Sequence, residues 1–262
     1  MNSYIGVTGF TTRYEVRAAV RAWERLPRLG DRQLMIGVLA KNTIFEGEDG
    51  YAGTLKHPAR YPRAGEIAMI FPPRSPGGTQ SLNLIHYATR EPGRLAHQLE
   101  AMRLLGGRNF HGFQLNVCWP DKDQLLASFE AGCKIVLQIG WQALEMVNHD
   151  PGQLRQRIVG YGDFLSGVLL DLSGGLGLPL DVEEIEPYVA ELFRYARAHA
   201  PWLSIGVAGG LTAETLPGLQ GLVDKYPQLS LDTESRIRTA DDQLDIAAME
   251  SYLVTAHSLF VR

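Results

Sequence analysis

The chain has 262 residues, of which 45% are hydrophobic and 21% are charged, and this is the composition of an ordinary soluble protein. A net charge of −4 with no basic block argues against nucleic-acid binding, and no apolar run approaches the roughly 20 residues that a membrane helix needs. The first ten residues lack the pattern of a signal peptide. Cys118 and Cys133 have neither disulfide nor metal-ligand spacing. We therefore expect a cytoplasmic protein with no metal, no other cofactor and no nucleic-acid or membrane partner.

Short apolar segments recur along the chain, each followed by a turn and a longer amphipathic stretch. Near-continuous apolar segments indicate a parallel sheet that helices cover. We predict strands over residues 4–9, 33–40, 81–88, 112–118, 134–140, 167–172, 203–209 and 229–234. Helical patterns lie between or after them at residues 12–26, 121–132, 181–200, 212–226 and 241–260. This order predicts a single-domain (β/α)8 barrel over residues 1–262. An open doubly wound sheet is the alternative, although no G-x-G-x-x-G pattern opens a helix.

The connection at residues 41–65, after the second predicted strand, is longer and more polar than the other connections. A loop of this length in a compact domain is usually functional or disordered. Lys41 and Arg60 lie on it. Either they bind a carboxylate of a small-molecule substrate, or they are solvated surface charges.

The carboxyl ends of the strands are where barrels of this type carry their active sites. Thr8, His86, Asn116, Asp171 and Asp232 stand at such ends. Two carboxylates at one mouth can act as a general acid and a general base, each tuned by burial and by the other's charge. Alternatively, each aspartate caps a helix or pairs with an arginine. His86 is a candidate proton shuttle, but the facing of its strand is ambiguous from the sequence.

The stretch "GVAGGLTAETL" at residues 206–216 predicts an anion site. Gly209 and Gly210 let the backbone approach a ligand closely, and Thr212 can cap a following helix. Exposed amides at such a helix start bind phosphate. A phosphate site between the seventh and eighth strands recurs in these barrels, so we add Ser235 and Arg236 from the last loop.

Three stretches of the later half carry a family resemblance. "GVLLDLSGGLG", "IGVAGGLTAETL" and "LDTESRIRT" resemble phosphoribosylanthranilate isomerase, an enzyme of tryptophan biosynthesis. In the first half, "VTGFT" stands where that family has I-C-G-I/L-T, "FQLN" where it has V-Q-L-H, and "HPARYP" resembles its S-P-R-Y stretch. The resemblance spans nearly the whole chain and implies an Amadori rearrangement of a phosphorylated aminoaldose.

The resemblance also implies roles for single residues. Asp171 matches the family's general acid, and Gly174 and Gly175 follow it as expected substrate contacts. Thr8 occupies the position of the family's cysteine base, and a hydroxyl without a nearby base cannot replace a thiolate. We expect Asp232 or another residue at the mouth to act as the base. At the last loop Glu234 would repel a phosphate, whereas Arg236 could bind one.

Three functions therefore stay open. The first is acid–base isomerisation of a phosphorylated sugar derivative by Asp171. The second is an aldolase, lyase or epimerase reaction on the same scaffold, and Lys41 is its candidate Schiff-base lysine. The third is a barrel that binds a phosphorylated metabolite without catalysis. A homodimer is a possible assembly in each case.

Overall fold

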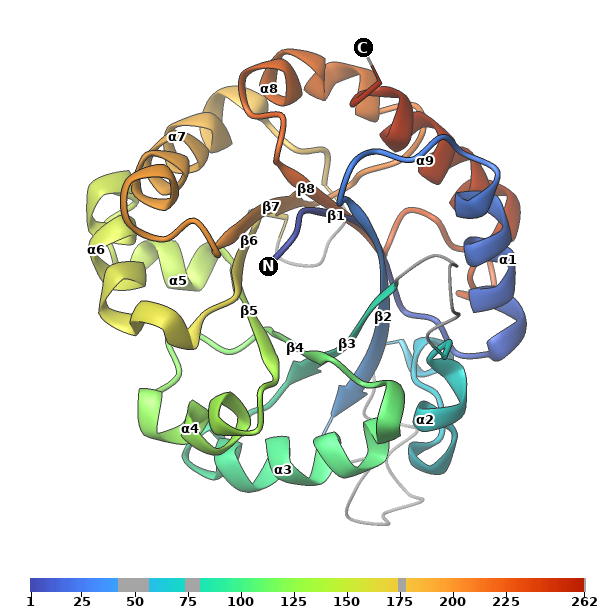
Figure 1. Cartoon of the computed structure of the whole chain (residues 1–262), viewed down its shortest axis with the longest axis horizontal. Helices are drawn as coiled ribbons and strands as arrows, with labels where there is room; N and C mark the ends of the chain where they lie inside the picture. Colours follow the sequence, from blue (N-terminus) through green and yellow to red (C-terminus); the bar gives the residue numbers. More distant parts are fainter. Residues whose placement is uncertain (42–56, 74–80, 174–177, 262) are drawn as a thin grey trace.

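The structure is a computed structural model that describes residues 1–41, 57–73, 81–173 and 178–261. Eight parallel strands form a closed barrel in chain order, and β8 pairs back to β1 (Figure 1). The strands are β1 (Tyr4–Thr8), β2 (Gln33–Lys41), β3 (Ser81–Ala88), β4 (Gly112–Leu115), β5 (Lys134–Ile139), β6 (Gly167–Asp171), β7 (Ser204–Ala208) and β8 (Ser230–Thr233). The predicted (β/α)8 barrel is confirmed, and every strand begins within one residue of its predicted start.

Helices surround the sheet as an outer ring (Figure 1). In the described residues they are α1 (Arg13–Glu24), α2 (Ile67–Ile70), α3 (Leu95–Gly106), α4 (Lys122–Glu130), α5 (Trp141–Glu145), α6 (Pro151–Tyr161), α7 (Val182–His199), α8 (Gln220–Lys225) and α9 (Ile246–Ser258). Local chemistry sets several helix starts. Thr12 and Glu15 form a capping box at α1, and Asp181 accepts two backbone N–H groups at the start of α7. None of these helices combines the length and the apolar character that crossing a membrane requires.

Two predicted helices begin later than expected. Residues 212–215 form a turn in which the Thr212 hydroxyl accepts backbone N–H groups, and α8 starts only at Gln220 after a short 3-10 helix that contains Pro217. The start predicted at residue 212 is therefore wrong. The last helix starts at Ile246, because Asp245 caps it and the preceding residues form an isolated antiparallel bridge. In both cases the turn chemistry competes with the helical pattern.

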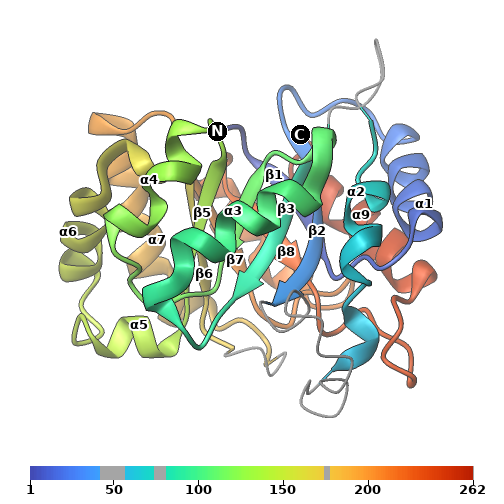
Figure 2. The same ribbon diagram turned by 90° about the horizontal axis from the view of Figure 1, so that it is seen from below.

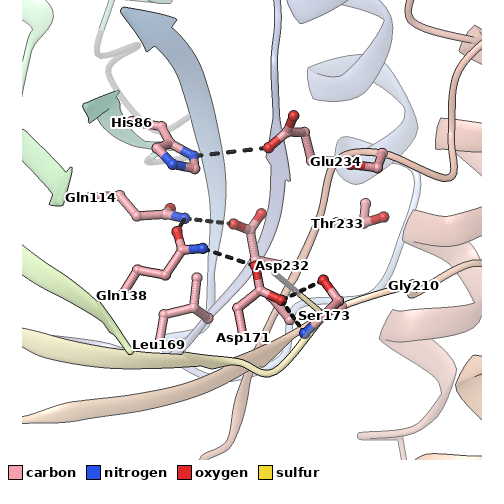
Figure 3. Close-up of a pocket in the computed structure, with 13 residues that line it drawn as sticks. His86, Gln114, Gln138, Leu169, Asp171, Ser173, Gly210, Asp232, Thr233 and Glu234 are labelled. Atoms are coloured by element: carbon pink, nitrogen blue, oxygen red, sulfur yellow. Dashed lines mark hydrogen bonds and ion pairs between the residues drawn. The ribbon is translucent and has the colours of Figure 1, made fainter. Parts of the chain in front are cut away.

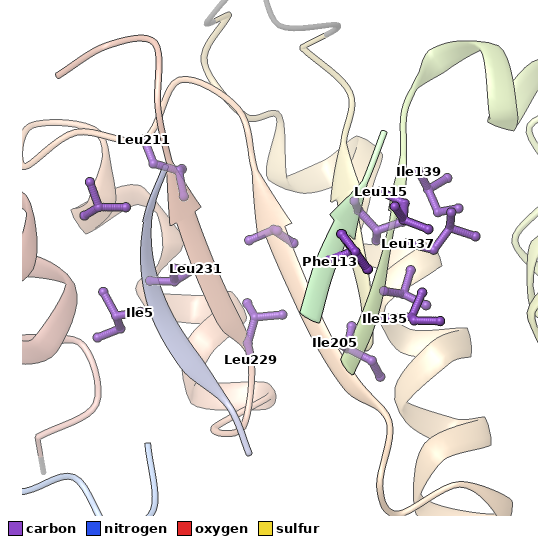
Figure 4. Packing of buried hydrophobic residues seen from close by; sticks show 14 of the residues in the cluster. Ile5, Phe113, Leu115, Ile135, Leu137, Ile139, Ile205, Leu211, Leu229 and Leu231 are labelled. Carbon is purple, nitrogen blue, oxygen red and sulfur yellow. The ribbon is translucent and has the colours of Figure 1, made fainter. Parts of the chain in front are cut away.

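The main core lies between the strands and the helices. Along each strand, alternate side chains face outward into it, as Phe113 and Leu115 of β4 and Ile135, Leu137 and Ile139 of β5 do (Figure 4). This packing explains why the strands have strong apolar patterns in the sequence. It also fixes their facing, since a shift by one residue would turn the outward-facing apolar side chains into the barrel interior and the polar ones into the core.

The barrel interior has a different composition at its two ends. A smaller apolar cluster fills the amino-terminal end and the middle, and its buried members are Tyr4, Met35, Leu82, Leu84, Val136, Leu169 and Ala208. Polar side chains replace apolar ones toward the carboxyl end, which is the end to which the arrowheads of β2 and β3 point in Figure 2. Thr8, His86, Gln114, Gln138, Asp171 and Asp232 are all buried there. The fold thus collects polar groups from six strands at one mouth.

Candidate active site

A small pocket opens at this polar mouth of the barrel (Figure 3). It has room of about 40 Å³ for water-sized molecules. Its wall consists of His86, Gln114, Gln138, Leu169, Asp171, Ser173, Ala208, Gly209, Gly210, Asp232, Thr233, Glu234 and Ser235. The pocket therefore brings together both predicted aspartates and the predicted loops after β7 and β8.

Asp171 ends β6 with its carboxylate fixed by three donors. Its Oδ2 accepts from Gln138 Nε2 at 2.9 Å. Its Oδ1 accepts from the Ser173 backbone N–H at 3.1 Å and from the Ser173 hydroxyl at 2.6 Å. A Cβ added at Gly209 would lie 3.3 Å from Oδ1, so a glycine there leaves space beside the carboxylate. Asp171 is thus oriented toward the pocket by a neighbour on β5 and by its own turn.

Asp232 lies deeper, and only 3% of it is exposed. The Thr8 hydroxyl donates to both of its carboxylate oxygens at 3.1 Å, and Gln114 Nε2 donates to Oδ2 at 3.1 Å. A Cβ at Gly6 would lie 2.8 Å from Oδ1, and one at Gly37 would lie 2.4 Å from the Thr8 hydroxyl oxygen. These two glycines make the room that the buried carboxyl and its donor occupy.

Burial raises the pKa of Asp232 from 3.8 to about 7. The negative charges of Glu234 and Asp171 raise this pKa further, while the hydrogen bonds from Gln114 and Thr8 oppose the shift. Around neutral pH the Asp232 carboxyl is present in both protonation states. Two carboxyl groups that line one pocket, one of them poised near neutrality, are suited to general acid–base chemistry.

His86 of β3 faces into the same pocket, which resolves the ambiguity of its strand. Its Nδ1 lies 4.0 Å from Oε2 of Glu234, and this buried nitrogen has no hydrogen-bond partner among the described residues. Burial lowers the pKa of His86, and the nearby Lys41 charge also lowers it, against the opposing charges of Glu234 and Asp171. His86 is therefore a neutral imidazole at the rim of the site.

Arg60 joins the loop after β2 to the loop after β8. Its Nε and Nη2 donate to Oδ1 of Asp242 at 2.9 and 2.7 Å, while Nη1 donates to Glu234 at 2.9 Å and to the Ser235 hydroxyl at 3.2 Å. Arg60 is only 7% exposed. The predicted substrate-binding arginine thus lies at the site, but protein carboxylates occupy it in this structure.

The other predicted site residues are less central. Lys41 places its Nζ 5.2 Å from the centre of the Tyr61 ring, and it does not line the pocket. Asn116 follows the end of β4 and is exposed, and Arg236 is exposed as well. Both side chains lie outside the pocket wall. Gly174 and Gly175 lie outside the described residues, as does the 42–56 part of the predicted long loop.

The loop predicted to bind an anion has part of the expected geometry. Gly209 and Gly210 have positive φ of 111° and 59°, a conformation that favours glycine, and both line the pocket with Ser235. The predicted helix start behind them is absent, because Thr212 closes a turn there. The partly buried guanidinium of Arg238 donates to the Thr8 and Gly9 carbonyls at the carboxyl end of β1.

Sequence reasoning missed several residues of the site. Gln138 alternates with outward-facing Leu137 and Ile139 on β5, and this alternation is a sequence signal that could have found it. Arg238 and Asp242 follow β8 in a polar stretch that gives no such periodic signal. Across the described residues, no group of three or more His, Cys, Asp or Glu side chains has the arrangement to hold a metal ion.

No protein-family model and no curated protein sequence matches the chain, but solved structures do. A phosphoribosylanthranilate isomerase from Thermus thermophilus superposes with a TM-score of 0.60 at 15% identity, over 98% of this chain and 99% of that one. The chain shares the fold of the phosphoribosylanthranilate isomerases. Another phosphoribosylanthranilate isomerase structure, in complex with reduced 1-(o-carboxyphenylamino)-1-deoxyribulose 5-phosphate, gives a TM-score of 0.59 at 13% identity and covers 98% of this chain and all of that one.

The barrel is also similar to an isomerase of another kind. Triosephosphate isomerase from Bartonella henselae gives a TM-score of 0.57 at 9% identity, over 97% of this chain and 99% of that one. At such low identities the likeness concerns the fold, and one fold hosts many reactions. The reaction must therefore be argued from the side chains of the site.

Proposed function

We propose that the protein is an acid–base isomerase of a phosphorylated sugar derivative. The observation that carries this proposal is that Asp171 and Asp232 line one pocket while burial raises the pKa of Asp232 to about 7. A base with a pKa near the working pH is partly deprotonated and still basic enough to accept a proton from carbon. The environments of the two carboxyls differ, as acid–base partners require.

The roles follow from the positions of the two carboxyls. Protonated Asp171 donates its proton to the ring oxygen of an aminoaldose, and the ring opens as the C1–O bond breaks and the lone pair of the amine nitrogen forms a C1=N bond. The Asp232 carboxylate then removes the proton from C2, the electron pair of that C–H bond forms C1=C2 while the C1=N pair returns to nitrogen, and the resulting enolamine tautomerises to the aminoketose. Thr8 does not line the pocket and acts through Asp232 as a positioning residue, since its hydroxyl donates to that carboxylate.

The loops after β7 and β8 support a phosphate group on the substrate. Gly209, Gly210 and Ser235 form one wall of the pocket, and Arg60 Nη1 points to Ser235 at 3.2 Å. The backbone of two glycines with positive φ, the Arg60 guanidinium and the Ser235 hydroxyl are groups that can together bind the oxygens of a phosphate. The similar isomerase structure that holds a ribulose 5-phosphate derivative makes the same substrate class reasonable here.

Fluorescence loss of N-(5′-phosphoribosyl)anthranilate tests the proposal. We expect slow turnover by the wild-type protein, because Thr8 stands where the resemblance implies a thiolate base. Asp171→Asn and Asp232→Asn should each lower kcat by about 100-fold or more, the usual contribution of a general acid or base. The exposed Asp163→Asn change is the control and should leave kcat unchanged.

Two results would refute this assignment. One is the absence of any turnover by the wild-type protein at high enzyme concentration. The other is turnover that survives both aspartate substitutions with an unchanged pH profile. In contrast, a rate that rises with pH through about 7 in the wild type and lacks that inflection in Asp232→Asn would support Asp232 as the base.

A further inference from the structure

Glu234 lines the pocket and faces His86 across it (Figure 3), and it also contacts Arg60. Its Oε1 accepts a hydrogen bond from Arg60 Nη1 at 2.9 Å, whereas its Oε2 lies 4.0 Å from His86 Nδ1. The second distance is too long for a hydrogen bond. The His86 side chain is only 9% exposed, and its Nδ1 has no hydrogen-bond partner among the described residues. A buried polar atom without a hydrogen-bond partner destabilises the fold. His86 Nδ1 can therefore form one more hydrogen bond, and the nearby acceptor is the Glu234 carboxylate.

Arg60 can keep its place when Glu234 leaves it. Asp242 holds the guanidinium by Nε at 2.9 Å and by Nη2 at 2.7 Å, and these contacts do not involve the Nη1 that serves Glu234. Nη1 also donates to the Ser235 hydroxyl at 3.2 Å. If Glu234 departs, Arg60 Nη1 and Ser235 together offer a preformed place for a ligand oxyanion.

The Glu234 side chain lines the pocket, and the displacement requires this side chain alone to move. Its main chain is tied down because its carbonyl oxygen accepts from Arg238 Nε at 3.1 Å. A rotation of the side chain alone would bring its carboxylate from 4.0 Å to about 2.8 Å from His86 Nδ1, the length of a charge-assisted hydrogen bond.

We propose that Glu234 is an internal anion that a ligand carboxylate or phosphate displaces from Arg60, and that the displaced carboxylate then pairs with His86, which takes up a proton from solvent. This inference rests on the proposed function only in that an anionic ligand enters this mouth. It makes anion binding and protonation of His86 two parts of one event. The occupied site then carries an imidazolium that the empty site lacks.

The charges around His86 set the size of the effect. Burial and Lys41 lower its pKa, while Glu234 and Asp171 raise it. An opposite charge that moves into hydrogen-bond contact raises the pKa of a histidine by about 1–3 units. Because the ligand replaces Glu234 on Arg60 and sends it toward His86, we expect the pKa of His86 to rise by at least about one unit on binding.

Nuclear magnetic resonance of isotope-labelled histidine tests this without any turnover. The chain has seven histidines, and a His86→Gln variant identifies the His86 signal. The wild-type protein is titrated with pH in buffer alone, with inorganic phosphate and with benzoate, and the Kd of each anion is measured at fixed pH. We expect at least one anion to bind and to raise the pKa of His86. The anion that does so shows whether the site prefers phosphate or carboxylate.

The Glu234→Gln variant distinguishes displacement of the Glu234 carboxylate toward His86 from a direct effect of the bound anion on His86. Removal of the internal competitor should tighten anion binding several-fold, yet His86 should no longer respond, because no carboxylate remains to pair with it. Glu100→Gln, which breaks an exposed pair with Arg103, is the matched control and should behave as the wild type.

Three outcomes would overturn the inference: no binding of either anion, a bound anion that leaves the pKa of His86 unchanged, or weaker anion binding by Glu234→Gln. None of these measurements depends on the isomerase reaction. If anion binding and the His86 response are both present while N-(5′-phosphoribosyl)anthranilate is not turned over, the proposed reaction fails and the displacement of Glu234 stands.

Discussion

The buried carboxyl of Asp232 makes the stability of the fold depend on pH. Its pKa is about 7 in the folded protein and 3.8 without the fold's influence, chiefly because of burial. Between these values the folded state keeps a proton that the unfolded state releases. The stability due to this group is therefore complete below about pH 4 and is lost as pH rises through about 7. Within that window each pH unit lowers the free energy of unfolding by about 1.4 kcal/mol.

Asp232→Asn removes this titration and nearly preserves the size of the side chain. An asparagine amide oxygen in the place of Asp232 Oδ2 can still accept from Thr8 and Gln114, which both donate to that oxygen now. From pH 5 to pH 8 the wild type crosses about two pH units of the window, so it should lose about 3 kcal/mol relative to the variant. Asp163→Asn, a change at an exposed position, should show no such pH-dependent difference.

Urea unfolding of the three proteins at both pH values measures the effect. Titrations of all other groups contribute nearly equally to wild type and variant, so the change in their difference isolates Asp232. A change below about 1 kcal/mol between pH 5 and pH 8 would refute the reasoning, because it would mean that Asp232 is charged at no cost in the folded protein.

Two further substitutions test the hydrogen bond from Thr8 and the close approach of Gly9 to Arg238. Thr8→Val removes a hydrogen bond that favours the charged form of Asp232, so its pKa should rise above about 7 and the pH-dependent loss of stability should extend to more alkaline pH; an unchanged profile would contradict this. Gly9→Ala places a Cβ 2.0 Å from Arg238 Nη2 at a φ of +94° and should lower the free energy of unfolding by about 1–3 kcal/mol. Gly30→Ala, where φ is +55° and nothing lies within 4 Å, is the control for backbone strain alone, and an equal loss in both variants would show that the Arg238 contact contributes nothing.

The sequence by itself predicted the barrel and the end of it that carries the site. Each strand begins within one residue of its predicted start. The outward-facing residues of each strand pack against helices and are therefore apolar, which gives each strand a recognisable apolar segment in the sequence. The position of Asp171 and Asp232 at the carboxyl ends of their strands predicted that both lie at one mouth, and both line the pocket there. Signals of this kind are local, so they can be read without knowing how the barrel closes.

Closure of the barrel decided which side chains meet and how they are charged. Arg60 and Asp242 are 182 residues apart in the chain, and Gln138 of β5 donates to Asp171 of the neighbouring strand β6. The periodicity of the sequence indicates neither pairing. Asn116 was predicted for the site and instead lies exposed beyond the end of β4, because that strand stops at Leu115. The pKa of Asp232 depends on complete burial and on the charges of Glu234 and Asp171, and both conditions exist only when all eight strands surround one pocket, since burial and Coulomb interactions depend on distance in space and not along the chain.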